Sequence, residues 1–375
     1  MIMLWAPPRR VNAVDFKIKA PYCFVTFPMA NLAPSKHPFL AACRSEPTSY
    51  TPVWLMRQAG RYMKEYRDLR AEHGFLDLCK KPELAAEITI TPVEKLKVDA
   101  AILFADILLI IEPMGAGLEY SKGGGPVIHH PVRSGKDVDA LRDFDVASEL
   151  AYVYEAVKQI CKELKGKVPL IGFAGAPFTL ASYLIEGGGS RHYIHTKKLC
   201  YTAPEAWKRL MERIAKVTAE YLNCQIAAGA QVVQIFDSWA GCLSPMDYEQ
   251  FVLPYTKMVI DALTPGTPVI NFSTGTSGLL TQIRAAGGSV MGVDWRVNLD
   301  EAWSALGDDV AIQGNLDPVA LLSSPKEIRS RVGDILNRAA GKPGHIFNLG
   351  HGVLPETPVD HVVTMVEAVH ELSAR

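Results

Sequence analysis

Eight short apolar segments, rich in β-branched residues, recur along the 375-residue chain and alternate with longer segments of helical periodicity. Their nearly continuous hydrophobicity is typical of strands that are buried on both faces, as in a parallel sheet. The predicted strands are Val53–Met56, Ala100–Phe104, Pro169–Phe173, Val232–Phe236, Pro268–Phe272, Ser289–Val293, Val310–Gln313 and His345–Leu349. The predicted helices, several of which begin at a proline that a first turn tolerates, are Pro82–Leu96, Ala147–Leu164, Ala203–Ala228, Pro245–Leu263, Pro325–Ala339 and Pro358–Leu372.

Repeated alternation of strand and helix predicts an α/β fold, and eight repeats predict a closed (β/α)8 TIM barrel in a single domain. An open doubly wound sheet is the alternative, but it would more naturally carry a glycine-rich phosphate-binding turn after its first strand. This chain has Arg57-Gln58-Ala59-Gly60-Arg61 at that point. The barrel is therefore the expected fold.

Two glycine-rich segments interrupt the alternation. Leu118–Val132, after the second strand, is interpreted as a small β-hairpin insertion that turns at Gly123-Gly124-Gly125-Pro126. Gly187–Ser190 separates two helical segments after the third strand, and Ser190 is a candidate N-cap. Neither glycine run has the spacing of a known phosphate-binding motif, so we interpret both as loops.

The first 28 residues differ in composition from the rest of the chain. They contain four basic residues against a single acid, Asp15, and their prolines interrupt any helix. Met29 resembles a second start. We therefore expect residues 1–28 to form a poorly ordered leader and residues 29–375 to form the barrel. An organellar transit peptide is the alternative for the leader, although it lacks a clear amphipathic pattern of Arg and Ser.

Charge and cysteine content argue against several classes of protein. A net charge of −1 and a pI near 6.8 argue against a nucleic-acid-binding protein, which would carry a basic patch. No apolar run reaches the roughly 18 to 20 residues of a membrane helix. The seven cysteines show neither CxxC nor Cys/His metal spacing, which predicts reduced thiols in an intracellular protein without a metal site. An anionic ligand would therefore need a local cluster of cations.

The carboxyl ends of barrel strands carry the reacting side chains of barrel enzymes. Polar residues that follow the predicted strands are therefore candidate site residues: Arg57 and Arg61 after the first strand, Asp106 after the second, Asp237 and Ser238 after the fourth, Asp294 after the sixth, Asn315 and Asp317 after the seventh, and His351 after the eighth. Phe104, Tyr183 and Phe236 would supply aromatic walls. This combination predicts a large, multiply anionic ligand that also carries N–H donors.

Each candidate also has a purely structural interpretation. The two arginines present planar forks that suit carboxylates or phosphates, but each could pair with a surface Glu instead. Asp106 could bind the ligand or cap the helix that follows it. Asp237 and Asp294 are interpreted as supports for neighbouring groups or loops. His351 lies between two glycines, which packing explains poorly, so we favour a role in the site.

Several sequence motifs together resemble the uroporphyrinogen decarboxylase family. They are WLMRQAGRYM at 54–63, ILFADIL at 102–108, GFAGAPFTLASYLIEGGGS at 172–190, FDSWAG at 236–241, QGNLDP at 313–318 and NLGHG at 348–352. The match runs from about residue 30 to the C-terminus. It implies a cytoplasmic, cofactor-free (β/α)8 barrel that is commonly a homodimer. The implied reaction removes CO2 from the four acetate side chains of uroporphyrinogen III, leaving the methyl groups of coproporphyrinogen III.

The resemblance also implies a set of site residues. The substrate-binding residues that it implies are Arg57, Gln58, Ala59, Gly60, Arg61, Asp106, Tyr183, Ser238 and His351. Asp106 would be the central catalytic carboxylate, and Arg57 would be a second catalytic residue and the candidate proton donor. The leader, residues 1–28, departs from the family pattern and leaves the compartment open.

Two other functions are alternatives to a decarboxylase. A corrinoid-dependent methyltransferase on the same barrel would need Cys and His ligands for zinc at strand ends, and Cys242 is the only cysteine close to one. A non-catalytic tetrapyrrole carrier would gain nothing from Asp106, because a buried carboxylate repels an anionic ligand. Both alternatives are therefore disfavoured.

Overall fold

The computed structural model describes residues 37–120 and 125–375. The predicted leader and the start at Met29 lie outside these residues, as do Gly123 and Gly124 of the predicted hairpin turn. In the described part of the chain, no helix is long and apolar enough to cross a membrane.

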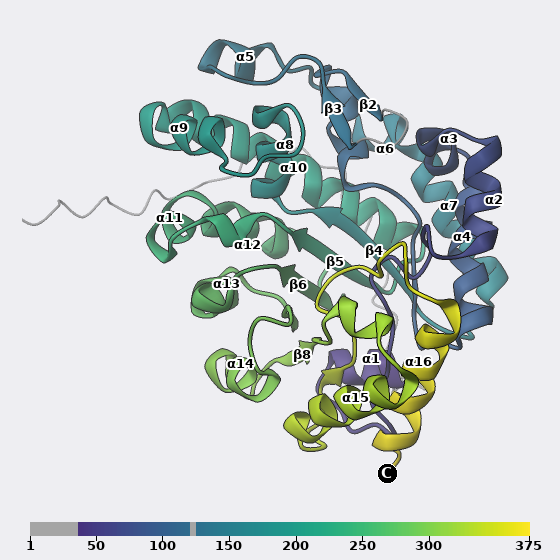
Figure 1. Ribbon diagram of the computed structural model, residues 1–375. Helices are drawn as coiled ribbons and strands as arrows, with labels where there is room; N and C mark the ends of the chain where they lie inside the picture. Colours follow the sequence, from purple (N-terminus) through teal and green to yellow (C-terminus); the bar gives the residue numbers. More distant parts are fainter. Residues whose placement is uncertain (1–36, 121–124) are drawn as a thin grey trace, which may run out of the picture. The chain divides into compact units, whose positions relative to one another are not determined.

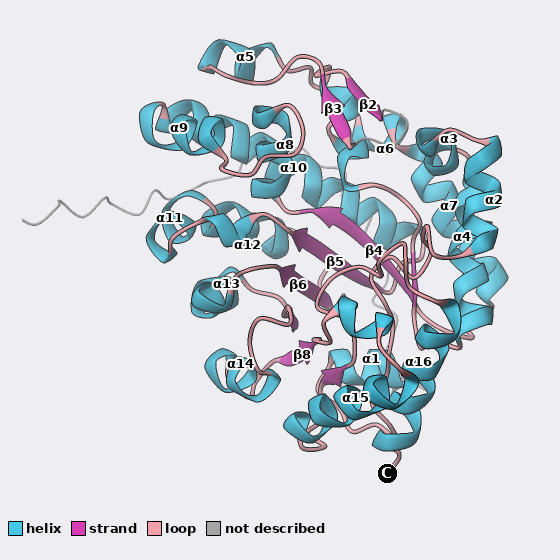
Figure 2. Ribbon diagram, in the orientation of Figure 1, coloured by secondary structure: helices cyan, strands magenta, loops and turns pink. Residues whose placement is uncertain are grey.

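The centre of the fold is a parallel sheet in which each strand pairs with the next one along the chain (Figure 2). Its strands are β1 (Ala101–Ile102), β4 (Leu170–Gly175), β5 (Val232–Asp237), β6 (Val269–Ser273), β7 (Val290–Gly292), β8 (Ala311–Gln313) and β9 (His345–Ile346). They correspond to the last seven predicted strands, with ends that differ from the predicted ones by at most three residues. Helices lie outside the sheet, as the alternating pattern predicts.

The helices have the following bounds: α1 (Pro38–Cys43), α2 (Lys64–Glu72), α3 (Phe75–Lys80), α4 (Pro82–Leu96), α5 (Gly135–Ala140), α6 (Val146–Glu149), α7 (Ala151–Leu164), α8 (Pro177–Glu186), α9 (Ile194–Thr202), α10 (Pro204–Ala228), α11 (Pro245–Phe251), α12 (Leu253–Asp261), α13 (Leu280–Ala286), α14 (Leu299–Leu306), α15 (Pro325–Ala339) and α16 (Val359–Ser373). Short 3-10 turns are η1 (Ile107–Ile110), η2 (Glu112–Met114), η3 (Ala240–Cys242), η4 (Ser277–Leu279) and η5 (Pro318–Leu322).

Two predicted helices are each divided in the structure. Ala147–Leu164 is interrupted at Leu150, and Pro245–Leu263 is interrupted at Val252. Pro254 explains the second break, because a proline has no N–H to donate and its ring clashes with the carbonyl four residues earlier. The predictions of single helices were wrong at these two points.

The first predicted strand closes the barrel, but only Val53 of Val53–Met56 pairs as a strand. Val53 bridges Phe347 in parallel, and its carbonyl accepts a hydrogen bond from the Asp99 N–H at 2.8 Å on the other side. The N–H groups of Leu55 and Met56 donate to the side chains of Gln58 and Asn348 instead of to a neighbouring strand. The predicted (β/α)8 barrel is confirmed, and the predicted four-residue strand is shortened to one bridge.

Asp99 links this seam to the last helix. Its Oδ2 accepts hydrogen bonds from the Val53 N–H at 2.7 Å and contacts Nε2 of His370, on α16, at 2.8 Å. The Thr51 N–H donates to Oγ of Ser373 at 2.8 Å. The seam between the first and last strands is therefore held by side chains as well as by backbone pairing.

The predicted hairpin insertion is confirmed by β2 (Leu118–Tyr120) and β3 (Pro126–Ile128), which pair antiparallel. Figure 1 shows it on the side of α5 and α8, opposite α15. Gly187 ends α8 with a φ of 87°. The prediction that Ser190 caps the following helix was wrong, because α9 begins only at Ile194. The Ser190 Oγ instead accepts a hydrogen bond from the Tyr193 N–H and donates one to Glu186.

Candidate functional site

Arg57 and Arg61 follow the closing bridge at Val53, in the segment that leaves the carboxyl end of the first strand. Both side chains are exposed, and neither guanidinium forms a hydrogen bond or ion pair with another described residue. Arg57 has a φ of 60°, a backbone region that non-glycine residues rarely occupy. The structural alternative, in which each arginine pairs with a surface Glu, is therefore wrong for both residues.

Of the two roles that the sequence left open for Asp106, the structure shows the cap, and ligand binding stays a prediction. Asp106 caps η1, because its Oδ1 accepts a hydrogen bond from the Leu108 N–H at 2.8 Å, and the same atom accepts one from the Tyr120 hydroxyl at 2.6 Å. Oδ2 has no hydrogen-bond partner among the described residues. Burial raises the pKa of Asp106, while the two hydrogen bonds and the charge of Arg57 oppose that rise.

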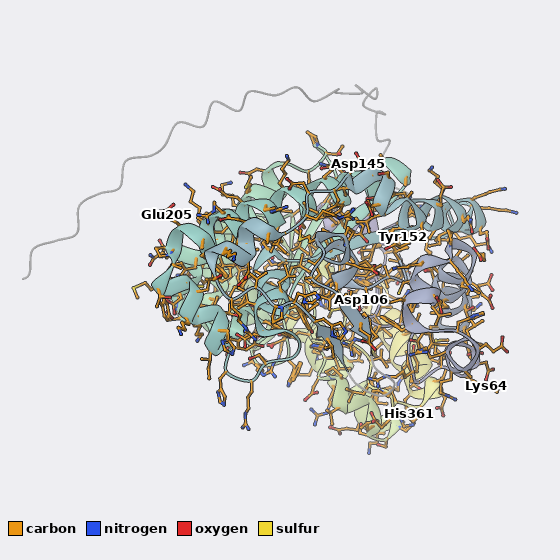
Figure 3. All side chains as sticks on the ribbon, turned by 90° about the horizontal axis from the view of Figure 1, so that it is seen from above. Lys64, Asp106, Asp145, Tyr152, Glu205 and His361 are labelled. Atoms are coloured by element: carbon orange, nitrogen blue, oxygen red, sulfur yellow. The ribbon has the colours of Figure 1, made fainter. Side chains whose placement is uncertain are left out.

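Tyr120 is a site residue that sequence reasoning missed. It comes from the hairpin, and its ring packs against Phe75 with centroids 4.8 Å apart; Phe75 in turn contacts Phe104. The sequence indicated that a hairpin follows the second strand, but it held no signal that the hairpin turns back over Asp106. In Figure 3, Asp106 lies near the centre of the view, whereas Lys64 and Glu205 lie toward its edges.

Tyr183 and Trp239 form one wall of the site. Tyr183 lies on α8, and its ring stacks on that of Trp239 with centroids 3.9 Å apart. Burial raises the pKa of Tyr183 to about 12; the charge of Asp106 adds to the rise and that of Arg57 opposes it. The hydroxyl is therefore neutral at physiological pH, and these electrostatic interactions place Tyr183, Asp106 and Arg57 in one neighbourhood.

Ser238 directly follows β5 and is half-buried beside Trp239. Its carbonyl accepts a hydrogen bond from the Thr274 hydroxyl at 2.7 Å. The Ser238 hydroxyl has no partner within the described ranges. It is therefore available to a ligand.

His351 is a neutral hydrogen-bond donor in this environment. Burial lowers its pKa to about 4, and the positive charges of Arg57 and Arg296 lower it further, against the effect of Asp294. Nδ1 accepts a hydrogen bond from the Gly352 N–H at 2.7 Å. In the neutral ring the proton then resides on Nε2, which is left to donate.

The glycines on either side of His351 do have a packing explanation, contrary to the expectation from the sequence. A Cβ atom on Gly350 would lie 2.5 Å from the Trp295 backbone nitrogen. A Cβ atom on Gly352 would lie 2.5 Å from Cδ of Arg57. Both distances are shorter than any normal contact, so the close approach of these loops requires glycine.

The other residues of the RQAGR motif lie differently from its arginines. Gln58 is buried, its Nε2 donates to the Ala100 carbonyl at 3.1 Å, and its Oε1 accepts from the Leu55 N–H. Ala59 is half-buried and packs against the core, and Gly60 is half-buried beside it. The side chain of Gln58 is thus used within the fold, and a role for these three residues in binding substrate stays a prediction.

Asp294 supports the loops around His351, as the sequence interpretation proposed. Its oxygens accept hydrogen bonds from the Gly275 N–H at 2.6 Å, the Arg296 N–H at 3.0 Å and the Arg296 guanidinium at 2.5 Å. Arg296 also lies over the Trp295 ring, 4.1 Å from its centroid. Sequence reasoning missed Arg296, although it stands two residues after a marked strand end.

Within residues 37–120 and 125–375, no three His, Cys, Asp or Glu side chains gather in a way that could hold a metal ion.

The barrel and its strand-end cluster define a (β/α)8 enzyme with a cationic, aromatic-walled site. The uroporphyrinogen decarboxylase (URO-D) family model matches residues 34–372. The chain belongs to this family, which makes it a carboxy-lyase.

Individual relatives agree with the family match. Uroporphyrinogen decarboxylase of Carboxydothermus hydrogenoformans is 58% identical over 337 residues, which cover 90% of this chain and 96% of that protein. The enzyme of the same name from Solibacter usitatus is 54% identical over 341 residues, covering 91% and 99%. Among solved structures, a methyltransferase from Methanosarcina mazei superposes with a TM-score of 0.77 at 20% identity, covering 89% of this chain and 97% of that one. The last similarity shows a shared fold alone.

Proposed function

We propose that this site binds uroporphyrinogen III and converts its four acetate side chains to methyl groups, giving coproporphyrinogen III and four molecules of CO2. The observation that carries the proposal is the combination of Asp106, which has one oxygen free, and two arginines whose guanidiniums have no partner among the described residues. The arginines match the peripheral carboxylates of the substrate, and the carboxylate matches its central pyrrole N–H groups.

The reaction needs an electron sink for the bond that breaks. Protonation of the ring carbon next to the one that bears the acetate makes the ring cationic, so that the acetate-bearing carbon can accept an electron pair from the acetate CH2. The electron pair of the C–CO2 bond then flows into the ring, a second proton completes the methyl group, and the first proton leaves the ring carbon. Asp106 would stabilise the cationic ring, because opposite charges interact far more strongly in a site shielded from water than in bulk solvent.

Arg57 and Arg61 would hold substrate carboxylates in a bidentate manner. Arg57 is also proposed as the second catalytic residue, which either donates the proton or positions the reacting acetate. Tyr183, Ser238 and the Nε2–H of His351 would donate hydrogen bonds to further carboxylates, since all three are neutral donors. None of these steps calls on a cofactor or a metal ion.

The same family resemblance supports the remaining features of the proposal. We propose a cytoplasmic homodimer that contacts neither nucleic acid nor membrane, with residues 1–28 as a leader and 29–375 as the barrel. Removal of residues 1–28 should leave turnover and thermal stability unchanged. A clear loss of either quantity would show that the leader contributes to the barrel or the dimer.

The direct test is an anaerobic assay of the purified protein with uroporphyrinogen III, with the products separated by chromatography after oxidation. The wild type should form coproporphyrinogen after exhaustive treatment with EDTA. Asp106→Asn should lose at least about a hundredfold in kcat, because the amide keeps the shape but cannot offset the charge of the ring. A wild-type kcat in Asp106→Asn, or activity that EDTA abolishes and zinc restores, would overturn the proposal.

A further inference from the structure

Thr179 connects three groups at one wall of the site. Its Oγ1 donates a hydrogen bond to Oδ1 of Asp237 at 2.7 Å and accepts one from the Trp239 N–H at 3.3 Å. Tyr183 lies one helical turn after Thr179 on α8, and its ring stacks on Trp239. The contacts therefore run from Asp237 to Thr179, along α8 to Tyr183, across to Trp239, and back along the chain past Ser238.

The Asp237–Thr179 pair is unusually costly for the fold. Thr179 is fully buried and Asp237 is 1% exposed, and Oδ2 of Asp237 is buried without a hydrogen-bond partner among the described residues. A buried polar atom without a partner costs stability, and an apolar residue would avoid this cost. Stability therefore does not explain why a carboxyl group occupies this position.

No cation among the described residues forms an ion pair with the Asp237 carboxyl. The titratable groups around it are Tyr193 at the start of α9, Cys242 in η3 and Tyr248 on α11. The Lys197 ammonium donates a hydrogen bond to the Cys242 carbonyl at 2.6 Å. Burial raises the pKa of Asp237 to about 7, against the effect of the Thr179 hydrogen bond. The Thr179 hydroxyl can donate to either protonation state of the carboxyl, so the contact persists through this titration.

We propose that Asp237 and Thr179 are positioning residues for the decarboxylation: together they fix α8 against the end of β5 and so set the places of Tyr183 and Ser238 in the substrate-binding wall. Asp237 ends β5 and directly precedes Ser238, while Thr179 sits one turn before Tyr183. The Asp237–Thr179 hydrogen bond therefore links two binding groups that come from different elements, together with the bond from the Trp239 N–H to Thr179. This inference rests on the proposed function for its catalytic consequence, but the geometry of the wall is independent of it.

Thr179→Val tests the pair, because valine keeps the shape and removes the hydroxyl. We expect KM for uroporphyrinogen to rise about tenfold with kcat within about twofold, since the groups displaced are binding groups. Thr179→Ser, which keeps the hydroxyl, should recover most of the lost kcat/KM. Thr218→Val on α10 is the matched control: Thr218 is also fully buried, but its hydroxyl has no hydrogen-bond partner among the described residues, so this variant should keep the wild-type KM.

Asp237 is tested by a second pair of variants. Asp237→Asn keeps an oxygen that can accept from Thr179, whereas Asp237→Ala does not, so the rise in KM should be several-fold smaller for Asn than for Ala. An unchanged KM in Thr179→Val, or an equal rise in Thr218→Val, would overturn the inference.

A measurement without substrate separates this inference from the proposed function. The Tyr183–Trp239 stack contributes to the near-ultraviolet circular dichroism, and Thr179→Val should change that signal while Thr218→Val should not. If the wild type failed to decarboxylate uroporphyrinogen but the spectral difference appeared, the proposed function would fail and the positioning of the wall would stand. If the wild type were active and no spectral or KM difference appeared, the positioning role would fail alone.

Discussion

The side chain of Arg57 lies directly against the α-carbon of Gly352: a Cβ atom there would be 2.5 Å from Cδ and 2.7 Å from Cγ of the arginine. Gly352→Ala should therefore displace the guanidinium and lower kcat/KM by about tenfold or more, since misplacement of a positioning group by about 1 Å is costly. Steady-state kinetics would show this. Gly278→Ala is the matched control, because nothing lies within 4 Å of a Cβ atom at that position. Equal kinetics for the two variants would contradict the contact.

Removal of the Tyr120 hydroxyl should shift the pH dependence of the reaction. The hydrogen bond from Tyr120 lowers the pKa of Asp106, so Tyr120→Phe should raise that pKa further. Asp106 acts as an anion in the proposed mechanism, and the acidic limb of kcat/KM should therefore move to higher pH. Tyr201→Phe, at an exposed hydroxyl that contacts Asp247 on the surface, should leave the limb in place. A shift to lower pH in Tyr120→Phe would argue against an anionic Asp106.

The two site arginines should respond differently to lysine. Arg61→Lys keeps the charge but loses the planar fork, so KM should rise clearly. Arg57→Lys should chiefly lower kcat, because Arg57 is proposed to donate the proton or position the reacting acetate. Intermediates with seven, six and five carboxylates should accumulate in both variants. Arg329→Lys, on the exposed side of α15, controls for loss of a guanidinium as such. If either lysine variant converted the substrate completely at the wild-type rate, the arginine that it replaces would have no specific role in the site.

Asp237 should make the stability of the protein depend on pH. Its pKa is about 7 in the folded state against an ordinary value of 3.8, so the folded state binds the proton more tightly than the unfolded state does. Stability is then lost as pH rises from about 4 to about 7, by about 4 kcal/mol if the whole difference is expressed. Asparagine at position 237 cannot ionise, so the free energy of unfolding of Asp237→Asn should rise relative to that of the wild type over this pH range, as measured by denaturant titration. Parallel pH curves for the two proteins would refute the assignment.

The sequence predicted the barrel because strands buried on both faces leave continuous apolar runs, which are visible without knowledge of the partner strands. The rule that barrel sites lie at strand ends then located Asp106 and both arginines. Tyr120 could not be found in this way, because its contact with Asp106 depends on how the hairpin folds back, which no local pattern encodes. The need for Gly352 is equally hidden, since its partner Arg57 lies at the other end of the chain.

Closure of the barrel at Val53 has a consequence for the order of events during synthesis. The residues that hold this seam are far apart in the sequence: Thr51 and Val53 come from one part, His370 and Ser373 from the last helix, and Asp99 bonds to Val53 and His370. A ribosome that has released only the first strands therefore exposes Arg57 and Arg61 on a segment without its partners. The seam that precedes the arginines is therefore complete only after residues 370–373 have emerged.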